Sequence, residues 1–341
     1  MIGPSTIGEL FVLGFRGETV PDWLRRFAQR FGLGGALLFD YDVGTRRYER
    51  NVRDPAQVRA LCAELAALPS APLAMVDQEG GQVRRLKEAR GFAPLPSALA
   101  FNRLPLARRQ ALADAAYAEL RGLGIAWNLA PVIDLNLNPA NPDIGAVERS
   151  YSADPMEVRA NAAVLAEAAR KAGLGLCLKH YPGLGGARTN SHLELTDLSD
   201  CMDERQLALF HELAPALPGQ AVLVSHGIVN PWEAGVPVSV SPVALGALRQ
   251  RLPDVLLLSD DLQMEGLQRR FSTGEACRRG IVAGLDLLLI GNNLRDESAQ
   301  AGSFAEALAE AVTADAPLAR HAEQALARVR RRKREFGFAL H

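Results

Sequence analysis

The feature that most constrains the fold of this chain is an alternation of short apolar runs with longer stretches of helical periodicity. The apolar runs are typical of buried strands in a parallel sheet, and the stretches between them fit repeated βα units. Eight such runs occur, at residues 10–15, 36–40, 73–78, 126–132, 176–180, 221–226, 255–260 and 286–291. Eight strands separated by helices favour a closed barrel over an open sheet.

Helical segments are expected between the strands, followed by one after the last strand and a longer one at the end of the chain. The first seven cover residues 21–31, 55–67, 107–123, 156–172, 204–213, 242–252 and 274–283, and residues 303–314 supply the eighth. The sequence therefore predicts an α/β fold: a (β/α)8, TIM-like barrel over about residues 8–314, in a single domain spanning 1–341. Residues 316–336 are amphipathic and predict a C-terminal helix that packs outside the barrel or shields its base. Its basic run, 330–334, is expected to be a solvated face.

Composition narrows the class of protein. With 341 residues, 48% hydrophobic residues and a formal net charge of −1, the chain is typical of an ordinary globular protein, and no nucleic-acid partner is expected. The four cysteines, Cys62, Cys177, Cys201 and Cys277, are scattered without zinc-site spacing and are interpreted as reduced core thiols. No metal or cofactor is expected. The amino terminus resembles no signal peptide and no run is long enough to span a membrane, so we expect a cytoplasmic monomer without a membrane partner.

Polar side chains follow almost every predicted strand. In a parallel barrel the carboxyl ends of the strands surround one mouth, so these residues are expected to share a pocket. They are Asp40, Asp77, Gln78, Glu79, Asp134, Asn136, Lys179, His180, His226, Asp260, Asp261, Asn292 and Asn293. Carboxylates, amides, a lysine and histidines without a metal-binding set favour acid–base chemistry on a neutral, hydroxyl-rich ligand such as a sugar. His226 and Asn292 are assigned to the mouth on position alone.

Five motifs, in order along the chain, resemble those of glycoside hydrolase family 3. They are VDQEGGQVRR at 76–85, NLAPVID at 128–134, ERSYSADP at 148–155, KHYPG at 179–183 and SDDLQM at 259–264. Within the family the chain is most similar to the single-domain β-N-acetylglucosaminidases of peptidoglycan recycling. The resemblance implies a retaining exo-glycosidase that hydrolyses terminal β-N-acetylglucosamine from muropeptides.

The resemblance also implies roles for individual residues. Asp260 is the expected nucleophile, forming a glycosyl-enzyme, whereas Asp261 is expected to face away and to cap a loop or helix. The ligands of the terminal sugar are expected to be Asp77, Arg85, Arg149, Lys179 and His180. An internal salt-bridge network among Asp77, Arg85 and Lys179 is a second interpretation, and the two are compatible.

The chain departs from the family pattern in the loop after the fifth strand. His192 matches the family's histidine acid/base, but the partner aspartate is replaced by Asn190, and a loop histidine is replaced by Leu184. A neutral amide orients an imidazole without stabilising its charged form. Three outcomes are open: a slowed hydrolase, a relative that uses another donor or acceptor, or a catalytically weak sugar-binding protein. The glycines at 183, 185 and 186 suggest that this loop moves over the site.

Overall fold

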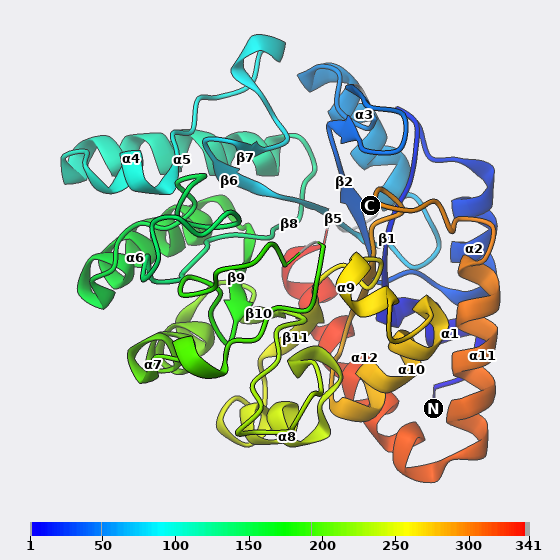
Figure 1. The fold of residues 1–341 in the computed structure, drawn as a ribbon. Coiled ribbons are helices and arrows are strands. Elements are labelled where there is room, and N and C mark those ends of the chain that lie inside the picture. The colour runs from blue at the N-terminus through cyan, green and yellow to red at the C-terminus, as the bar shows by residue number, and fades with distance from the viewer. Residues whose placement is uncertain (1, 49, 192, 338–341) are drawn as a thin grey trace.

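Eight short strands form the centre of the protein, and every pairing between them is parallel (Figure 1). The computed structural model describes residues 2–48, 50–191 and 193–337. The strands are β1 (Phe11–Gly14), β2 (Gly35–Leu38), β5 (Leu73–Val76), β8 (Trp127–Asn128), β9 (Gly175–Tyr181), β10 (Ala221–Val224), β11 (Leu256–Ser259) and β12 (Leu288–Ile290). Their order is β11-β10-β9-β8-β5-β2-β1-β12, and a parallel bridge between Leu258 and Leu287 joins the two edges. The sheet closes into a barrel, and the eight predicted strands are confirmed.

Helices surround this barrel, as Figure 1 shows, and they confirm the predicted helices to within two residues at each end. They are α2 (Asp22–Phe31), α3 (Pro55–Ala66), α5 (Leu106–Gly122), α6 (Pro155–Ala172), α7 (Glu204–Leu213), α8 (Pro242–Arg251), α10 (Thr273–Ala283) and α11 (Ala301–Ala314). Residues at the first turn of each helix determine where the helix begins. At α3, for example, the Asp54 side chain accepts the N–H of Gln57 at 2.9 Å, and Pro55 occupies a first-turn position that needs no N–H donor.

Several smaller elements were not predicted. Two hairpins, β3 (Tyr41–Asp42) with β4 (Arg47–Tyr48) and β6 (Gln78–Gly80) with β7 (Val83–Arg84), follow β2 and β5. The short helices are α1 (Pro4–Ile7), α4 (Ala98–Asn102) and α9 (Glu265–Gln268). The hairpins matter for function because they extend the carboxyl-end rim of the barrel.

The core has two parts, one inside the barrel and one between the strands and the helices. Apolar side chains fill the barrel, among them Val12, Leu37, Met75, Trp127, Leu223, Leu256 and Leu289. Cys62, Cys177 and Cys277 are buried free thiols, whereas Cys201 is partly exposed. Among the described residues no helix has both the length and the apolar composition that crossing a bilayer requires.

The C-terminal helix α12 (Ala316–Phe336) lies against the amino end of the barrel. Val329 is fully buried and belongs to the same cluster as the barrel-filling side chains. The basic residues beside it bind acids that precede strands: Arg330 lies 2.6 Å and Lys333 3.1 Å from the Glu9 carboxylate. Arg332 is 4% exposed. The expectation that run 330–334 is a solvated face holds for exposed Arg334 but is wrong for Arg332 and Lys333, whose side chains are largely buried at the base of the barrel.

Asp286 tests whether buried ion pairs hold α12 against the base of the barrel. Its buried carboxylate accepts hydrogen bonds from Arg328 on α12 at 2.8 Å and from Arg249 on α8 at 2.7 Å. We expect Asp286→Asn to lower the free energy of unfolding by about 2 to 4 kcal/mol, because two partly buried guanidinium groups lose their counter-ion. Chemical denaturation followed by circular dichroism measures this change.

The matched control is Asp254→Asn. Asp254 pairs with Arg331 on the same helix at 3.1 Å, but its side chain is 72% exposed. Exposed pairs contribute about 0 to 1 kcal/mol, so this variant should stay close to wild type. Equal losses in the two variants would show that burial of the Asp286 pair is not what secures the helix.

Candidate active site

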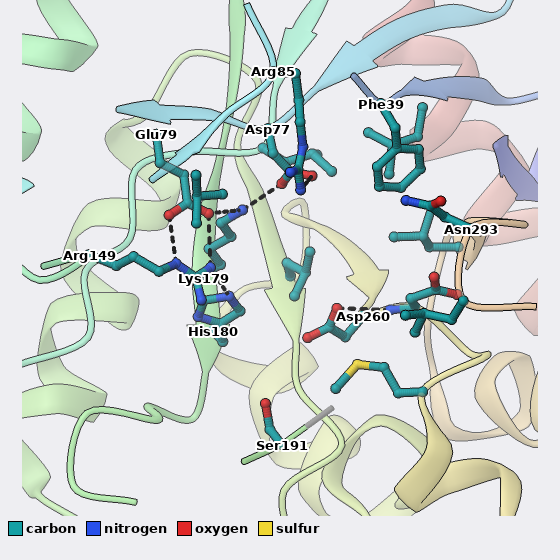
Figure 2. A pocket seen from close by; sticks show the side chains of 18 of the residues that line it. Phe39, Asp77, Glu79, Arg85, Arg149, Lys179, His180, Ser191, Asp260 and Asn293 are labelled. Atoms are coloured by element: carbon teal, nitrogen blue, oxygen red, sulfur yellow. Dashed lines mark hydrogen bonds and ion pairs between the residues drawn. The ribbon is translucent and has the colours of Figure 1, made fainter. Parts of the chain in front are cut away.

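A cavity of about 270 Å³ opens at the carboxyl ends of the strands (Figure 2). Side chains from the predicted strand ends line it, namely Asp77 after β5, Lys179 and His180 on β9, and Asp260 after β11. Arg85, on the segment after β7, and Arg149, on the loop between β8 and α6, complete the predicted set found there. Six of the predicted site residues therefore share one cavity, although they are spread over more than 180 positions of the sequence.

At one side of the cavity an ammonium group lies between two carboxylates. Lys179 is 3% exposed, and its Nζ atom lies 2.6 Å from Asp77 Oδ1 and 2.6 Å from Glu79 Oε1. Both acids come from the segment that follows β5, and Lys179 comes from β9. Buried charges are stable only when they are paired, so these three side chains hold one another in place.

Arg149 extends this cluster toward His180. Its Nε and Nη2 atoms lie 2.7 and 2.9 Å from the two oxygens of Glu79, which is the bidentate geometry of a strong charge-assisted pair. The same Nη2 atom lies 3.0 Å from His180 Nε2. Because a guanidinium only donates, Nε2 accepts here, and Nδ1 carries the hydrogen that it donates to Asp134 Oδ2 at 2.7 Å. The His180 ring is therefore fixed in one tautomer.

The charges in the cluster reinforce one another. Burial alone raises the pKa of Asp77, but the positive charges of Lys179 and Arg85 outweigh it and hold the pKa below its usual value. Glu79 is affected in the same way: burial is opposed by Arg149 and Lys179, and its pKa falls far below the ordinary range. Burial lowers the pKa of Lys179, yet its two acidic neighbours raise it overall. All of these groups are charged at neutral pH.

Arg85 connects the cluster to the rim. Its Nη2 atom lies 3.4 Å from Asp77 Oδ2, and its guanidinium lies 5.4 Å from the centre of the Phe39 ring. The internal network among Asp77, Arg85 and Lys179 is thus present. The same side chains still border the cavity, so the network leaves them available to a ligand.

The adjacent acids after β11 have different surroundings. Asp260 Oδ1 accepts the N–H of Asp261 at 2.8 Å, and the carboxylate faces the charged cluster across the cavity (Figure 2). Asp261 Oδ1 accepts the N–H groups of Gln263 at 3.0 Å and Gly291 at 3.1 Å. The first acid is open to a ligand, and the second caps loop backbone, as predicted. Asp261 also borders the cavity, so the expectation that it faces away is not met.

The remaining wall of the cavity is largely apolar. Phe39, Tyr41, Val43, Met264 and Leu294 line it, from the segments that follow β2, β11 and β12. Val43 is 43% and Leu294 39% exposed, so the apolar surface continues to the rim. A ligand that fits this cavity has polar groups on one side and an apolar face on the other.

Two of the predicted substrate-binding residues, and also Asn190, do not line the cavity. His226 is buried, with Nδ1 2.7 Å from Ser239 Oγ and Nε2 3.0 Å from the carbonyl oxygen of Asp261. Asn292 has a φ of 49°, and its Nδ2 donates to the carbonyl of Gly14 at 2.9 Å. Their expected place at the mouth is corrected: both side chains hold neighbouring segments together, whereas Asn293 borders the cavity.

The loop after β9 approaches the cavity with Leu184 and Ser191. Asn190 precedes Ser191, and the predicted acid/base His192 lies outside the described residues. Leu184 is 2% exposed. Gly185 is explained by packing, because a Cβ atom there would lie 1.7 Å from the carbonyl oxygen of Leu135. The glycine therefore allows close contact with the neighbouring loop, and mobility is not needed to account for it.

Glu79 and Asp134 were expected at strand ends, but neither was predicted to have a role in the site. Glu79 is the common partner of Lys179 and Arg149, and Asp134 orients His180. Their positions within two of the five motifs were the available signal. In the described part of the chain no group of three or more His, Cys, Asp or Glu side chains is arranged to hold a metal ion.

The barrel and its charged cavity define a (β/α)8-barrel protein with a pocket suited to a hydroxyl-rich ligand. The profile of the glycosyl hydrolase family 3 N-terminal domain matches residues 13–331. A β-hexosaminidase of Thiobacillus denitrificans is 33% identical over 308 residues, which cover 86% of this chain and 81% of that protein. One from Photobacterium profundum is 32% identical over 278 residues, covering 79% and 78%. The chain belongs to glycoside hydrolase family 3.

Solved structures of similar proteins have the same fold as this chain. A family 3 β-N-acetylglucosaminidase from Paenibacillus sp. FPU-7 superposes with a TM-score of 0.84 at 29% identity, covering 99% of this chain. This chain spans only 64% of that protein. A β-N-acetylhexosaminidase from Beutenbergia cavernae gives a TM-score of 0.83 at 27% identity, covering 97% of this chain and 98% of its own.

Glu79 tests whether the paired charges of the cluster stabilise the folded protein. Its pKa is lowered in the folded protein, so its contribution to stability is present above its unfolded pKa of about 4.3 and is lost as the pH falls below that value. We expect Glu79→Gln to cost about 3 kcal/mol at pH 7, because Lys179 and Arg149 lose a shared counter-ion. The difference from wild type should shrink steadily from pH 5 to pH 3 in urea denaturation.

Glu88→Gln serves as the control, since Glu88 pairs with Arg84 nearby but its side chain is 51% exposed. A difference between wild type and Glu79→Gln that stays constant from pH 7 to pH 3 would contradict the ionised cluster described above.

Proposed function

We propose that this chain is a retaining exo-glycosidase that hydrolyses terminal β-linked N-acetylglucosamine, with Asp260 as the nucleophile. The observation that carries the proposal is the position of the Asp260 carboxylate, which faces the Asp77–Lys179–Glu79–Arg149 cluster across one cavity (Figure 2). The names of the relatives, β-hexosaminidase and β-N-acetylglucosaminidase, support the same sugar.

The cluster suits the hydroxyl groups of a single terminal sugar. Asp77 accepts from neighbouring hydroxyls, while Lys179, Arg85 and Arg149 donate, and charged partners make such hydrogen bonds roughly twice as strong as neutral ones. His180, held by Asp134, adds a ring in a fixed orientation. Since these groups are already paired, little reorganisation accompanies binding of the sugar.

The proposed reaction has two steps. In the first, an Asp260 oxygen bonds to the anomeric carbon while the bond to the leaving oxygen breaks, and His192 gives that oxygen a proton. In the second, the neutral imidazole removes a proton from water, which attacks the anomeric carbon and releases Asp260 as a carboxylate. The configuration at the anomeric carbon is inverted twice and is therefore retained.

As the natural substrate we propose muropeptides derived from peptidoglycan, hydrolysed by a monomer in the cytoplasm. The five motifs that resemble the recycling enzymes support this assignment. The apolar wall formed by Tyr41, Val43 and Leu294 at the rim is suited to the aglycone side of such a substrate.

Replacement of Asp260 tests the proposal directly. We expect Asp260→Asn to lower kcat/KM for aryl N-acetylglucosaminide on the order of 10⁴-fold, because the amide is not a nucleophile. A 5-fluoro N-acetylglucosaminyl fluoride should label the wild-type protein, and peptide mass spectrometry should place the added sugar on Asp260.

Asp261→Asn is the matched control, because the amide oxygen still accepts the N–H groups that Asp261 caps. It should keep activity within about tenfold of wild type. Near-normal turnover by Asp260→Asn, or a label on another carboxylate, would show that the nucleophile has been misassigned.

A second function, a catalytically weak sugar-binding protein, is favoured by one observation: Asn190 and Leu184 stand where the family has charged or titratable side chains. The two functions predict different results in one assay. Turnover of aryl N-acetylglucosaminide, compared with aryl glucoside and repeated with added phosphate, identifies the sugar and the acceptor. Tight N-acetylglucosamine binding in calorimetry without turnover would favour the binding protein.

A further inference from the structure

A carboxylate from a neighbouring loop is bonded to the loop that contains the proposed acid/base. Asp143 lies between β8 and α6, and its Oδ2 atom accepts the N–H of Ser191 at 2.7 Å. Asp143 is buried, with only 8% of its surface exposed. Ser191 lines the cavity and directly precedes His192 in the sequence. A buried carboxylate therefore lies against the backbone one position before the proposed acid/base in the sequence.

The position of this carboxylate is fixed by its surroundings. Asn141 Oδ1 accepts the N–H of Asp143 at 2.8 Å, and Asn141 Nδ2 donates to the carbonyl of Leu184 at 2.6 Å. Arg149 Nη1 donates to the carbonyl of Asp143 at 2.9 Å. The two loops are thus joined, and the residue that binds Glu79 and His180 also holds Asp143 in place.

From this geometry we propose that Asp143 supplies the carboxylate that the family pattern has at position 190. This inference rests on the function proposed above. Asn190 carries no charge, so it cannot stabilise an imidazolium electrostatically. Asp143 brings the missing charge from the adjacent βα loop, which makes it a positioning residue rather than a catalytic one.

The chemical consequence concerns the first step of the reaction. The imidazolium of His192 gives its proton to the leaving oxygen as the glycosidic bond breaks, and Asp143 remains ionised throughout. An opposite charge nearby typically raises a histidine pKa by about 1 to 3 units, which keeps the acid protonated at neutral pH. Asn190 is then compatible with an active hydrolase.

A purely structural role for Asp143 predicts different behaviour. In that case its carboxylate only accepts the Ser191 N–H, and the amide oxygen of an asparagine replaces it. Asp143→Asn keeps the shape and the acceptor but removes the charge. The variant therefore separates a charge effect from a loop-anchoring effect, and a thermal melt checks that the fold is retained.

For the charge effect we expect a dependence on the leaving group. Asp143→Asn should lower kcat/KM for chitobiose, a poor leaving-group substrate, by about 10²-fold, and for 2,4-dinitrophenyl N-acetylglucosaminide by less than about fivefold. The basic limb of the kcat/KM profile should move down by about one pH unit or more, because the acid loses the charge that raised its pKa.

Moving the carboxylate back to position 190 completes the test. Asn190→Asp alone should change activity by less than about threefold, because the charge is already supplied. Added to Asp143→Asn, it should recover at least about tenfold on chitobiose and return the basic limb toward wild type. Asp197→Asn, in the same loop, is the control: exposed Asp197 also accepts a backbone N–H, from Ser199 at 2.9 Å, and both leaving-group classes should be unaffected.

Equal losses on both substrates with an unchanged pH profile would overturn the inference and leave Asp143 as a loop anchor. A gain of about 10²-fold on chitobiose from Asn190→Asp alone would overturn it as well. Either result leaves the proposed function standing while the wild type still labels on Asp260. Failure of that labelling would instead reject the function itself.

Discussion

The buried ammonium of Lys179, held 2.6 Å from each of two carboxylates, is the interaction on which the cavity depends. A buried lysine is stable only when it is paired, and each acid here keeps its charge because of the cations around it. Asp77 and Glu79 follow β5 whereas Lys179 lies on β9, so the pairing exists only when β5, β8 and β9 lie side by side in the sheet. Organisation of the site therefore depends on formation of this part of the sheet.

The strands and their polar ends could be predicted because apolar runs of five to seven residues, and the polar residues that end or follow almost every run, are local features of the sequence. The direction of a side chain at a strand end is not local. His226 lies two residues beyond β10 and bonds to Ser239, and Asn292 adopts a left-handed backbone conformation that turns its amide toward Gly14. Polarity located the mouth of the barrel, but register and loop path decided which residues reach it.

The same distinction explains the basic run at the end of the chain. Charge and amphipathicity alone favoured a solvated face, since nothing in the run identifies its partners. The partners Glu9 and Asp254 are separated from it by many residues and precede β1 and β11. Acids at the amino ends of the strands thus bind the last helix, leaving the carboxyl ends free to form the cavity.

At positions 184 and 190 this chain has uncharged side chains where the family pattern has a histidine and an aspartate. A family motif records where along the chain a charge usually lies, but catalysis requires only that the charge lie near the proton donor. In a barrel, consecutive βα loops meet at one mouth, so a carboxylate from the loop after β8 reaches the loop after β9, as Asp143 reaches Ser191. Leu184, buried beside the same junction, fills space where the family has a polar ring. A motif that has lost its aspartate therefore does not establish that the site has lost its charge.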